Sequence, residues 1–274
     1  MKNLVVIKPD NYTKNYLKDF INFKELLLVF ALRDISVKYK QTSFGFLWAL
    51  IRPLMTMIIF TFVFGRIAKL ETAAIPYPVL VLAGVLPWQF FANSFSEASN
   101  SLLNNESLIT KAYFPRLILP ISVILGTSLE FIICLGLLFI LMIWFNVQMT
   151  LNLLALPFLY LLTILVILGP SLWFASLNVK YRDLRYIIPF LLQLGLFVTP
   201  VGFSSSLVPE KWATLYNLNP LVFLIDAFRW SILGSESISF SSGQVVGFII
   251  IVLTLLFSGI YFFCRTEKNF ADNI

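Results

Sequence analysis

Two charged residues lie inside long apolar stretches, and their chemistry is the first clue to function. Arg52 belongs to the run GFLWALIRPLMTMIIFTFVFG at 45–65. A guanidinium group pairs well with phosphate oxygens, so Arg52 is a candidate phosphate contact at a substrate entrance. Counted from Gly45, Arg52 is about two turns from the polar edge of this run, so snorkelling into the headgroup layer is the alternative. The residue types leave both interpretations open.

Glu130 is the second such residue and lies near the middle of the apolar run 117–145. Thr127 and Ser128 lie close by on the same run, which suits a carboxylate held by hydrogen bonds within the protein. An ion-coupled carrier usually places several carboxylates at mid-bilayer, and Glu130 is the single clear one here. We therefore treat Glu130 as an intramembrane polar residue, with ion coupling as the weaker interpretation.

Several other kinds of chemistry are not expected. The sequence contains no His and its acidic residues are scattered, whereas an intramembrane transferase needs a catalytic cluster. Cys134 and Cys264 lie in separate apolar runs and suggest neither a disulfide framework nor a metal site. No phosphate-binding loop of the form G-x-x-x-x-G-K-[ST] occurs. We expect no catalytic residue and no cofactor in this chain, and ATP-driven transport would need a separate subunit that binds ATP and Mg²⁺.

The elements that carry these residues are predicted to be membrane spans. The chain of 274 residues is 59% hydrophobic and 12% charged, and its mean hydropathy is +0.87. Soluble domains carry roughly 25% charged residues, and a soluble fold as apolar as this one would expose large apolar patches. A bilayer solvates such surfaces directly. The sequence therefore predicts an all-α polytopic membrane protein.

Six apolar runs are long enough to be spans, because about 20 helical residues cross the ~30 Å hydrocarbon core. They are 45–65, 77–96, 117–145, 151–177, 187–203 and 244–264. Between the fifth and sixth runs, 212–234 is apolar but contains polar residues and a proline that a lipid-facing helix disfavours. These are Asn217, Asn219, Pro220, Asp226 and Arg229. A pair of re-entrant or interfacial helices, buried against protein, accommodates them at lower cost.

An amphipathic helix is predicted at 23–40, before the first span. Its apolar stripe consists of Leu28, Leu32, Ile35 and Tyr39, and its polar stripe of Arg33, Ser36 and Lys40. This pattern is typical of a helix that lies in the headgroup layer. An ordinary solvated helix packed on its own protein is the alternative.

The basic residues predict the orientation of the chain. With the N-terminus inside, fifteen of the twenty Lys and Arg residues fall in cytoplasmic segments and four in outer segments. This positive-inside bias predicts a cytoplasmic segment at 1–43, a transmembrane domain at 44–264 and a cytoplasmic tail at 265–274. Topology therefore explains the net charge of +6 better than nucleic-acid binding does.

Two polar segments on the cytoplasmic side are candidates for docking a partner. In NNESLITKAYFPR at 104–116, Asn105 is a predicted N-cap, Glu106 falls in the first helical turn and Pro115 ends the helix. A short capped helix between two spans suits a rigid lever, and an ordinary connecting loop is the alternative. The second segment is Lys180-Tyr181-Arg182-Asp183, whose charges would otherwise serve only membrane topology.

Five stretches, in order along the chain, resemble the permease subunits of bacterial polysaccharide ABC exporters. They are RDISVKYKQTSFGFLWALIRPL at 33–54, PYPVLVLAGVLPWQFF at 76–91, NNESLITKAYFPR at 104–116, NVKYRDLRYIIPF at 178–190 and NPLVFLIDAFRWSILG at 219–234. The resemblance covers roughly 24–264. Its first stretch is most similar to the branch of these type-2 export permeases that moves O-antigen and teichoic acid.

The resemblance implies half of a transporter. Two copies of this chain would join two copies of a separate ABC ATPase that binds ATP and Mg²⁺, in a bacterial inner membrane with both termini cytoplasmic. The substrate would be an O-antigen-like glycan on a polyprenyl diphosphate, moved from the cytoplasm across the membrane. An ATP-driven exporter of a drug, a peptide or another lipid-linked substrate on the same scaffold is the alternative.

The resemblance also assigns groups of residues to tasks. ATPase docking falls on Asn104, Asn105, Glu106, Lys111, Tyr113, Phe114, Arg116, Lys180, Tyr181, Arg182 and Asp183. A diphosphate headgroup would be attracted to a basic substrate entrance formed by Arg33, Lys38, Tyr39, Lys40 and Arg52. An outer gate falls on the mixed region 204–234 and the residues just before it; its candidates are Pro200, Trp212, Asn219, Pro220, Asp226 and Arg229.

Overall fold

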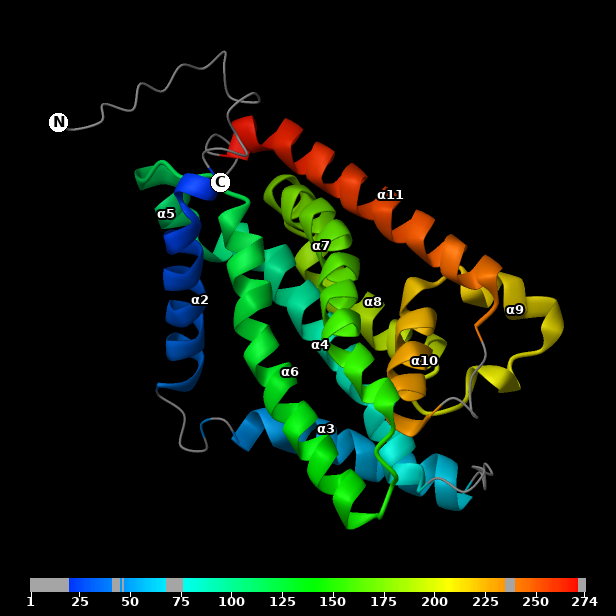
Figure 1. Ribbon diagram of the computed structural model, residues 1–274. Coiled ribbons are helices and arrows are strands. Elements are labelled where there is room, and N and C mark those ends of the chain that lie inside the picture. The colour runs from blue at the N-terminus through cyan, green and yellow to red at the C-terminus, as the bar shows by residue number, and fades with distance from the viewer. Residues whose placement is uncertain (1–19, 41–44, 46, 68–75, 235–239, 271–274) are drawn as a thin grey trace.

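The computed structural model describes residues 20–40, 45, 47–67, 76–234 and 240–270, and over these ranges every regular element is a helix (Figure 1). In chain order they are α2 (Lys24–Tyr39), α3 (Leu47–Phe60) with its π-helical continuation η2 (Thr61–Ile67), α4 (Tyr77–Asn104), α5 (Glu106–Lys111), α6 (Ile118–Trp144), η3 (Leu151–Ala155), α7 (Leu156–Lys180), α8 (Leu184–Val198), η4 (Ser205–Leu207), α9 (Glu210–Asn217), α10 (Pro220–Leu233), α11 (Ser242–Thr266) and η5 (Glu267–Asn269). The all-α prediction is confirmed for these residues. The predictions for 1–19, 41–43 and 271–274 lie outside the described residues.

Five helices among the described residues are long and apolar enough to cross a membrane. They are Leu47–Ile67, Tyr77–Asn104, Ile118–Trp144, Leu151–Lys180 and Ser242–Thr266. These helices correspond to the first four predicted spans and the sixth. The second is longer than predicted, because α4 continues past residue 96 to Asn104.

The fifth predicted span is shorter than expected. Its helix, α8, has 15 residues and is therefore about 22 Å long, whereas the hydrocarbon core is about 30 Å thick. The helix ends because Pro200 disfavours a helical conformation at Thr199, which is extended with φ −92° and ψ 153°. By length the described residues contain five spans, so the count of six is not confirmed.

The segment between α8 and α11 forms two short helices, as predicted. α9 and α10 are separated at Leu218 and Asn219. The Asn219 side chain accepts a hydrogen bond from the Leu221 backbone N–H at 3.0 Å, and Pro220 occupies the first turn of α10. Most of α10 is buried against α4 and α7. The re-entrant placement of this pair in a bilayer stays a prediction.

The helix predicted at 23–40 is confirmed as α2, which runs beside α6 (Figure 1). Phe30 and Ala31 are its buried residues. Leu28 and Leu32, from the predicted apolar stripe, are 61% and 63% exposed. The predicted stripe is therefore divided: Leu28 and Leu32 suit contact with lipid, whereas Ile35 and Tyr39 are half-buried and Tyr39 contacts α6.

The bundle has two ends, named here after the short helices that they carry. The α5 end contains α5, the start of α6 and the ends of α7 and α11 (Figure 1). These segments share an apolar cluster with α2, made of Phe30, Leu102, Ile109, Phe114, Ile118, Leu119, Leu172, Ala175, Val179, Phe263 and Phe270. The α10 end contains α9, α10 and the start of α4. Between the ends, α4 is the central helix and packs on α3, α6, α7 and α10.

α7 and α11 approach so closely that their backbones touch. A Cβ atom on Gly259 would lie 2.4 Å from the Gly169 carbonyl oxygen, and one on Gly169 would lie 2.7 Å from the Leu255 carbonyl carbon. Small residues allow membrane helices to pack in this way, since dispersion contacts rather than water drive their association. The pair Gly169 and Gly259 therefore fixes α11 against the bundle.

Gly259→Leu should separate α7 from α11. Overpacking of this kind costs about 1–3 kcal/mol, so the thermal midpoint of the purified protein in mild detergent should fall by several degrees. Gly247→Leu is the matched control, because no atom lies within 4 Å of a Cβ added to Gly247 on the same helix. Equal midpoints for the two variants would contradict the close contact.

Candidate functional site

A pocket of about 360 Å³ lies between α2, α3, α4 and α6. Its lining residues are Lys38, Tyr39, Gly45, Trp48, Ala49, Arg52, Leu86, Gln89, Phe90, Asn93, Thr127, Glu130, Phe131 and Cys134. The pocket brings together three of the five predicted entrance residues, Lys38, Tyr39 and Arg52, with the intramembrane Glu130. It is therefore the place where the charged residues singled out in the sequence meet.

Glu130 is a paired residue that fastens α2 to α6. Its Oε1 lies 2.6 Å from Lys38 Nζ and accepts a hydrogen bond from the Tyr39 hydroxyl at 2.5 Å. Lys38 Nζ also lies 2.7 Å from Glu97 Oε1 on α4. A carboxylate that is only 15% exposed on a membrane helix needs such partners, because an uncompensated buried charge is strongly destabilising. Glu130 is thus held within the protein by Lys38 and Tyr39 of α2, whereas Thr127 and Ser128 both donate to the carbonyl of Ile124. Any role of Glu130 in transport stays a prediction.

The surroundings of Lys38 and Tyr39 fix the protonation states of these two side chains. Burial lowers the pKa of Lys38, but the carboxylates of Glu97 and Glu130 raise it, and the net change is upward. Burial and the hydrogen bond to Glu130 raise the pKa of the Tyr39 hydroxyl. Lys38 is therefore charged and Tyr39 is a neutral donor throughout the physiological pH range.

Arg52 lines the same pocket, and its guanidinium is not neutralised by a carboxylate of the described residues. Arg52 is exposed, and over the described residues no carboxylate forms an ion pair with its guanidinium. The following residue, Pro53, has no N–H, so it leaves the carbonyl of Ala49 without its helical donor. Cys134 Sγ on α6 donates to that carbonyl at 3.2 Å. Cys134 of α6 thus binds the carbonyl that Pro53 leaves free in α3. The Arg52 side chain is not used for this purpose and stays available for an anion.

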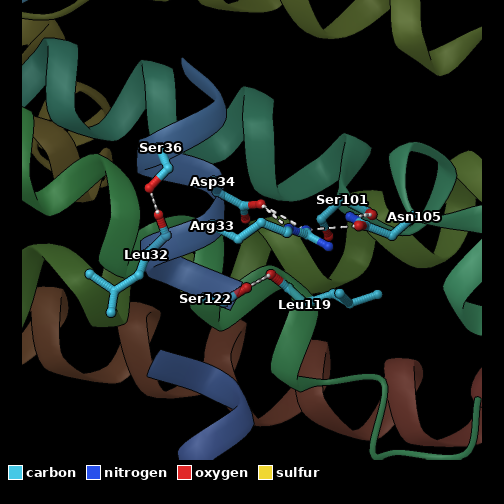
Figure 2. A network of polar contacts seen from close by, with 8 residues as sticks. All are labelled: Leu32, Arg33, Asp34, Ser36, Ser101, Asn105, Leu119 and Ser122. Atoms are coloured by element: carbon cyan, nitrogen blue, oxygen red, sulfur yellow. Dashed lines mark hydrogen bonds and ion pairs between the residues drawn. The ribbon is translucent and has the colours of Figure 1, made fainter. Parts of the chain in front are cut away.

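The other two entrance candidates lie elsewhere. Arg33 donates to Asp34 Oδ1 at 2.7 Å and to Asn105 Oδ1 at 2.9 Å (Figure 2). Its guanidinium also lies 4.8 Å from the centre of the Phe30 ring. Lys40 is exposed and does not line the pocket. Arg33 therefore joins α2 to the junction of α4 and α5, and the predicted entrance is divided between two places.

The predicted docking segment 104–116 contains the expected short helix, α5, with Glu106 in its first turn. Asn105 occupies the predicted N-cap position, but its side chain makes no capping hydrogen bond to α5. Instead it donates to the Ser101 carbonyl at 2.9 Å and accepts from Arg33 (Figure 2). Pro115 does not end the helix either, since α5 already ends at Lys111.

The docking candidates divide by exposure. Asn104, Glu106, Lys111 and Tyr113 are exposed, and so are Lys180, Tyr181, Arg182 and Asp183 in the turn between α7 and α8. Phe114 is buried and packs edge-to-face on Phe30 with ring centres 5.7 Å apart, whereas Asn105 and Arg116 are half-buried. Both exposed groups lie at the α5 end of the bundle, which a single partner could contact.

The outer-gate candidates at the α10 end are mostly structural in their contacts. Arg229 is 2% exposed and donates to the carbonyls of Val201 and Phe203, both at 2.8 Å, and of Leu80 at 3.4 Å. A Cβ on Gly84 would lie 2.9 Å from the Arg229 guanidinium, so glycine leaves the room that this side chain needs. Arg229 therefore fastens the turn after α8 to α4 and α10.

The remaining candidates of this group surround Arg229 at different depths. Asp226 is 7% exposed, and its side chain accepts a hydrogen bond from Ser205. Pro200 is buried, Asn219 caps α10 with Pro220 following it, and Trp212 on α9 is 55% exposed. The structure thus brings Pro200, Asp226 and Arg229 to one turn and leaves Trp212 on the surface.

A comparison with protein families decides the membership of the chain. The family model described as ABC-2 type transporter matches residues 25–233, which include α2, the pocket, α5 and α10. The chain belongs to the ABC-2 type transporter family. As an ABC-2 transporter it is a multi-pass membrane protein and a transport subunit, and ATPase activity belongs to a separate subunit.

Curated relatives of this ABC-2 transporter are named for the export or transport of polysaccharides. An O-antigen export system permease protein of Klebsiella pneumoniae is 28% identical over 90% of this chain and 94% of its own length. A protein of the same description from Myxococcus xanthus is 27% identical over 77% and 82%. A polysialic acid transport protein of Escherichia coli is 24% identical over 86% and 92%. The family resemblance read from the five sequence stretches is confirmed.

Sequence reasoning missed the contribution of α4 to the pocket. Gln89, Asn93 and Glu97 follow one another at intervals of four, which places them on one face of α4. Glu97 pairs with Lys38, and Gln89 Nε2 donates to Thr56 Oγ1 at 3.3 Å. That spacing was a visible signal, and it predicts a polar face directed at α2 and α3.

A double-mutant cycle on Lys38 and Glu130 should detect their interaction. Lys38→Ala and Glu130→Ala should each lower the thermal midpoint in detergent, because each leaves the other charge with fewer partners. The double variant should lose about 1 kcal/mol less stability than the sum of the two single losses. This coupling is modest because the Lys38 side chain is 38% exposed. Lys40→Ala, on an exposed neighbour, is the control and should match the unmodified protein. Strict additivity would mean that the pair does not hold α2.

Proposed function

We propose that this chain is the membrane subunit of an ATP-driven exporter that moves a polyprenyl-diphosphate-linked, O-antigen-like polysaccharide out of the cytoplasm across the inner membrane. The observation that carries the proposal is Arg52, which lies at the wall of a pocket in a membrane helix and forms an ion pair with no carboxylate of the described residues. The names of the relatives, which are permeases for O-antigen and polysialic acid, support polysaccharide as the cargo.

The pocket suits the headgroup of such a lipid. Arg52 offers a planar set of donors to the phosphate oxygens, whereas the nearby Lys38 is already paired with Glu97 and Glu130. Trp48 and Phe90 provide aromatic surface beside these charges, where the apolar part of the lipid or a sugar ring can pack. The low dielectric constant of the surroundings strengthens the attraction to a diphosphate.

The energy would come from an ABC ATPase that binds ATP and Mg²⁺ and docks at the α5 end. Its contact surface would consist of the exposed residues of 104–113 and the turn Lys180–Asp183. Two ATPase copies and a second copy of this chain would complete the exporter. The start of α2 and the end of α11 lie at this same end, in agreement with two cytoplasmic termini and the positive-inside bias.

Arg52→Ala should reduce export of the lipid-linked glycan by about tenfold or more, since a charge-assisted contact to phosphate contributes about 1.5–3 kcal/mol. The measurement is surface glycan on intact cells, together with glycan that accumulates inside. Arg66→Ala is the control, because Arg66 is also exposed and lies at the far end of the same span. Normal surface glycan with Arg52→Ala, at normal protein levels, would remove the headgroup role.

Co-purification should recover a stoichiometric ATPase subunit with the tagged chain from mild detergent. Reversing the charge of Lys111 and Arg182 to Glu should weaken this association and lower the ATPase turnover, because both side chains are exposed at the α5 end. Lys211→Glu, at the α10 end, should leave both unchanged. Recovery of a stable chain without any nucleotide-binding companion would refute the ATP-driven mechanism.

A further inference from the structure

The C-terminal turn folds back onto the segment between α5 and α6. The carboxylate of Glu267 accepts a hydrogen bond from the Arg116 backbone N–H at 2.9 Å. The backbone carbonyl of Glu267 accepts a second bond from the Arg116 guanidinium, which also lies 5.9 Å from the centre of the Phe270 ring. Three contacts thus join two segments that are 151 residues apart in the sequence.

The placement of Glu267 is unusual for a residue just past the end of a membrane helix. Glu267 is 0% exposed, although a carboxylate at such a position could face water at no cost. A buried carboxylate is tolerated only when its partners are fixed and close. The neighbouring Lys268 is exposed, so the turn is oriented with its acid toward Arg116 and its lysine toward water.

Phe270 anchors the same turn from the apolar side. It is 2% exposed and packs edge-to-face on Phe263 of α11, with ring centres 5.4 Å apart. The apolar cluster at the α5 end also contains Ile109 of α5, Phe114 and Val179. Val179 precedes Lys180, the first residue of the second exposed group. The C-terminal turn therefore shares one core with both proposed ATPase contacts.

We propose that the turn Glu267–Phe270 positions the ATPase-contact surface and connects it to α11. This inference rests on the proposed function, in which the ATPase docks on 104–113 and Lys180–Asp183. When the ATPase displaces α5, the bonds between Arg116 and Glu267 transmit the displacement to the end of α11. Because α11 meets α7 backbone to backbone at Gly169 and Gly259, it carries the displacement into the bundle. Glu267 and Phe270 are positioning residues, since they act through Arg116.

The test compares three variants of the full chain in complex with its ATPase. Glu267→Ala removes the acceptor for the Arg116 N–H but keeps the backbone carbonyl that the guanidinium binds. Glu267→Gln keeps an acceptor oxygen at the same place, and Lys268→Ala changes an exposed neighbour. The readouts are hydrogen exchange of the amides in 112–118, the amount of bound ATPase, and glycan exported per ATP hydrolysed.

With Glu267→Ala we expect exchange in 112–118 to accelerate about tenfold, which corresponds to one lost hydrogen bond. Bound ATPase should be unchanged, and glycan exported per ATP should fall at least about fivefold, the loss expected for about 1 kcal/mol of coupling. Glu267→Gln should restore most of both values, and Lys268→Ala should resemble the unmodified protein. A role limited to folding would lower the amount of complex, not the ratio of export to hydrolysis.

Faster exchange with an unchanged export ratio would overturn the inference and leave the turn a local support. If no ATPase binds the unmodified chain, the proposed function fails, whereas the exchange experiment still shows whether Glu267 holds Arg116. If Glu267→Ala does not fold, Phe270→Leu provides the second test. It keeps an apolar side chain in the cluster but removes the ring beside Arg116, and an export ratio equal to that of the unmodified protein would also overturn the inference.

Discussion

A bilayer contains no water to complete a broken backbone hydrogen bond, and this constraint accounts for much of the architecture. At two interruptions of helices, donors from other elements bind the carbonyls that are left free. Pro53 exposes the carbonyl of Ala49, and Cys134 of α6 binds it. The turn after α8 exposes several carbonyls, and Arg229 binds two of them closely while the Tyr77 hydroxyl binds that of Gly202. The side chains that complete the backbone also fix which helices are neighbours.

Three basic residues, Arg33, Lys38 and Arg52, differ in whether protein groups neutralise them. Arg33 and Lys38 are held by protein acceptors, and they attach α2 to the junction of α4 and α5 and to the middle of α6. Arg52 alone of these three makes no ion pair within the described residues. Pairing the first two charges avoids the cost of isolated charges at the membrane, and the third is the one that we propose for binding the ligand. Basic side chains thus serve both the packing of the helices and the proposed binding site.

Local patterns in the sequence predicted the elements well, because spans, α2, α5 and the α9–α10 pair are each encoded by a contiguous stretch of residues. The failures concern long-range contacts. Asn105 is a residue type that favours N-caps, but its Oδ1 accepts a hydrogen bond from Arg33, which lies 72 residues earlier. Lys38 was read as a substrate charge, yet its partners Glu97 and Glu130 come from α4 and α6. The length of α8 depended on one residue, Pro200, whose effect on Thr199 is local and was available in the sequence.

The pairing of Glu130 with α2 also bears on how the chain enters the membrane. Tyr39 precedes Glu130 by 91 residues, and Lys38 stands one residue earlier still. At synthesis rates of about 5–20 residues per second, the partners of this carboxylate leave the ribosome about 5–20 seconds before it does. The third span therefore integrates into a bilayer where a lysine and a tyrosine are already present. Because the partners are synthesised first, Glu130 does not have to enter the membrane as an unpaired charge.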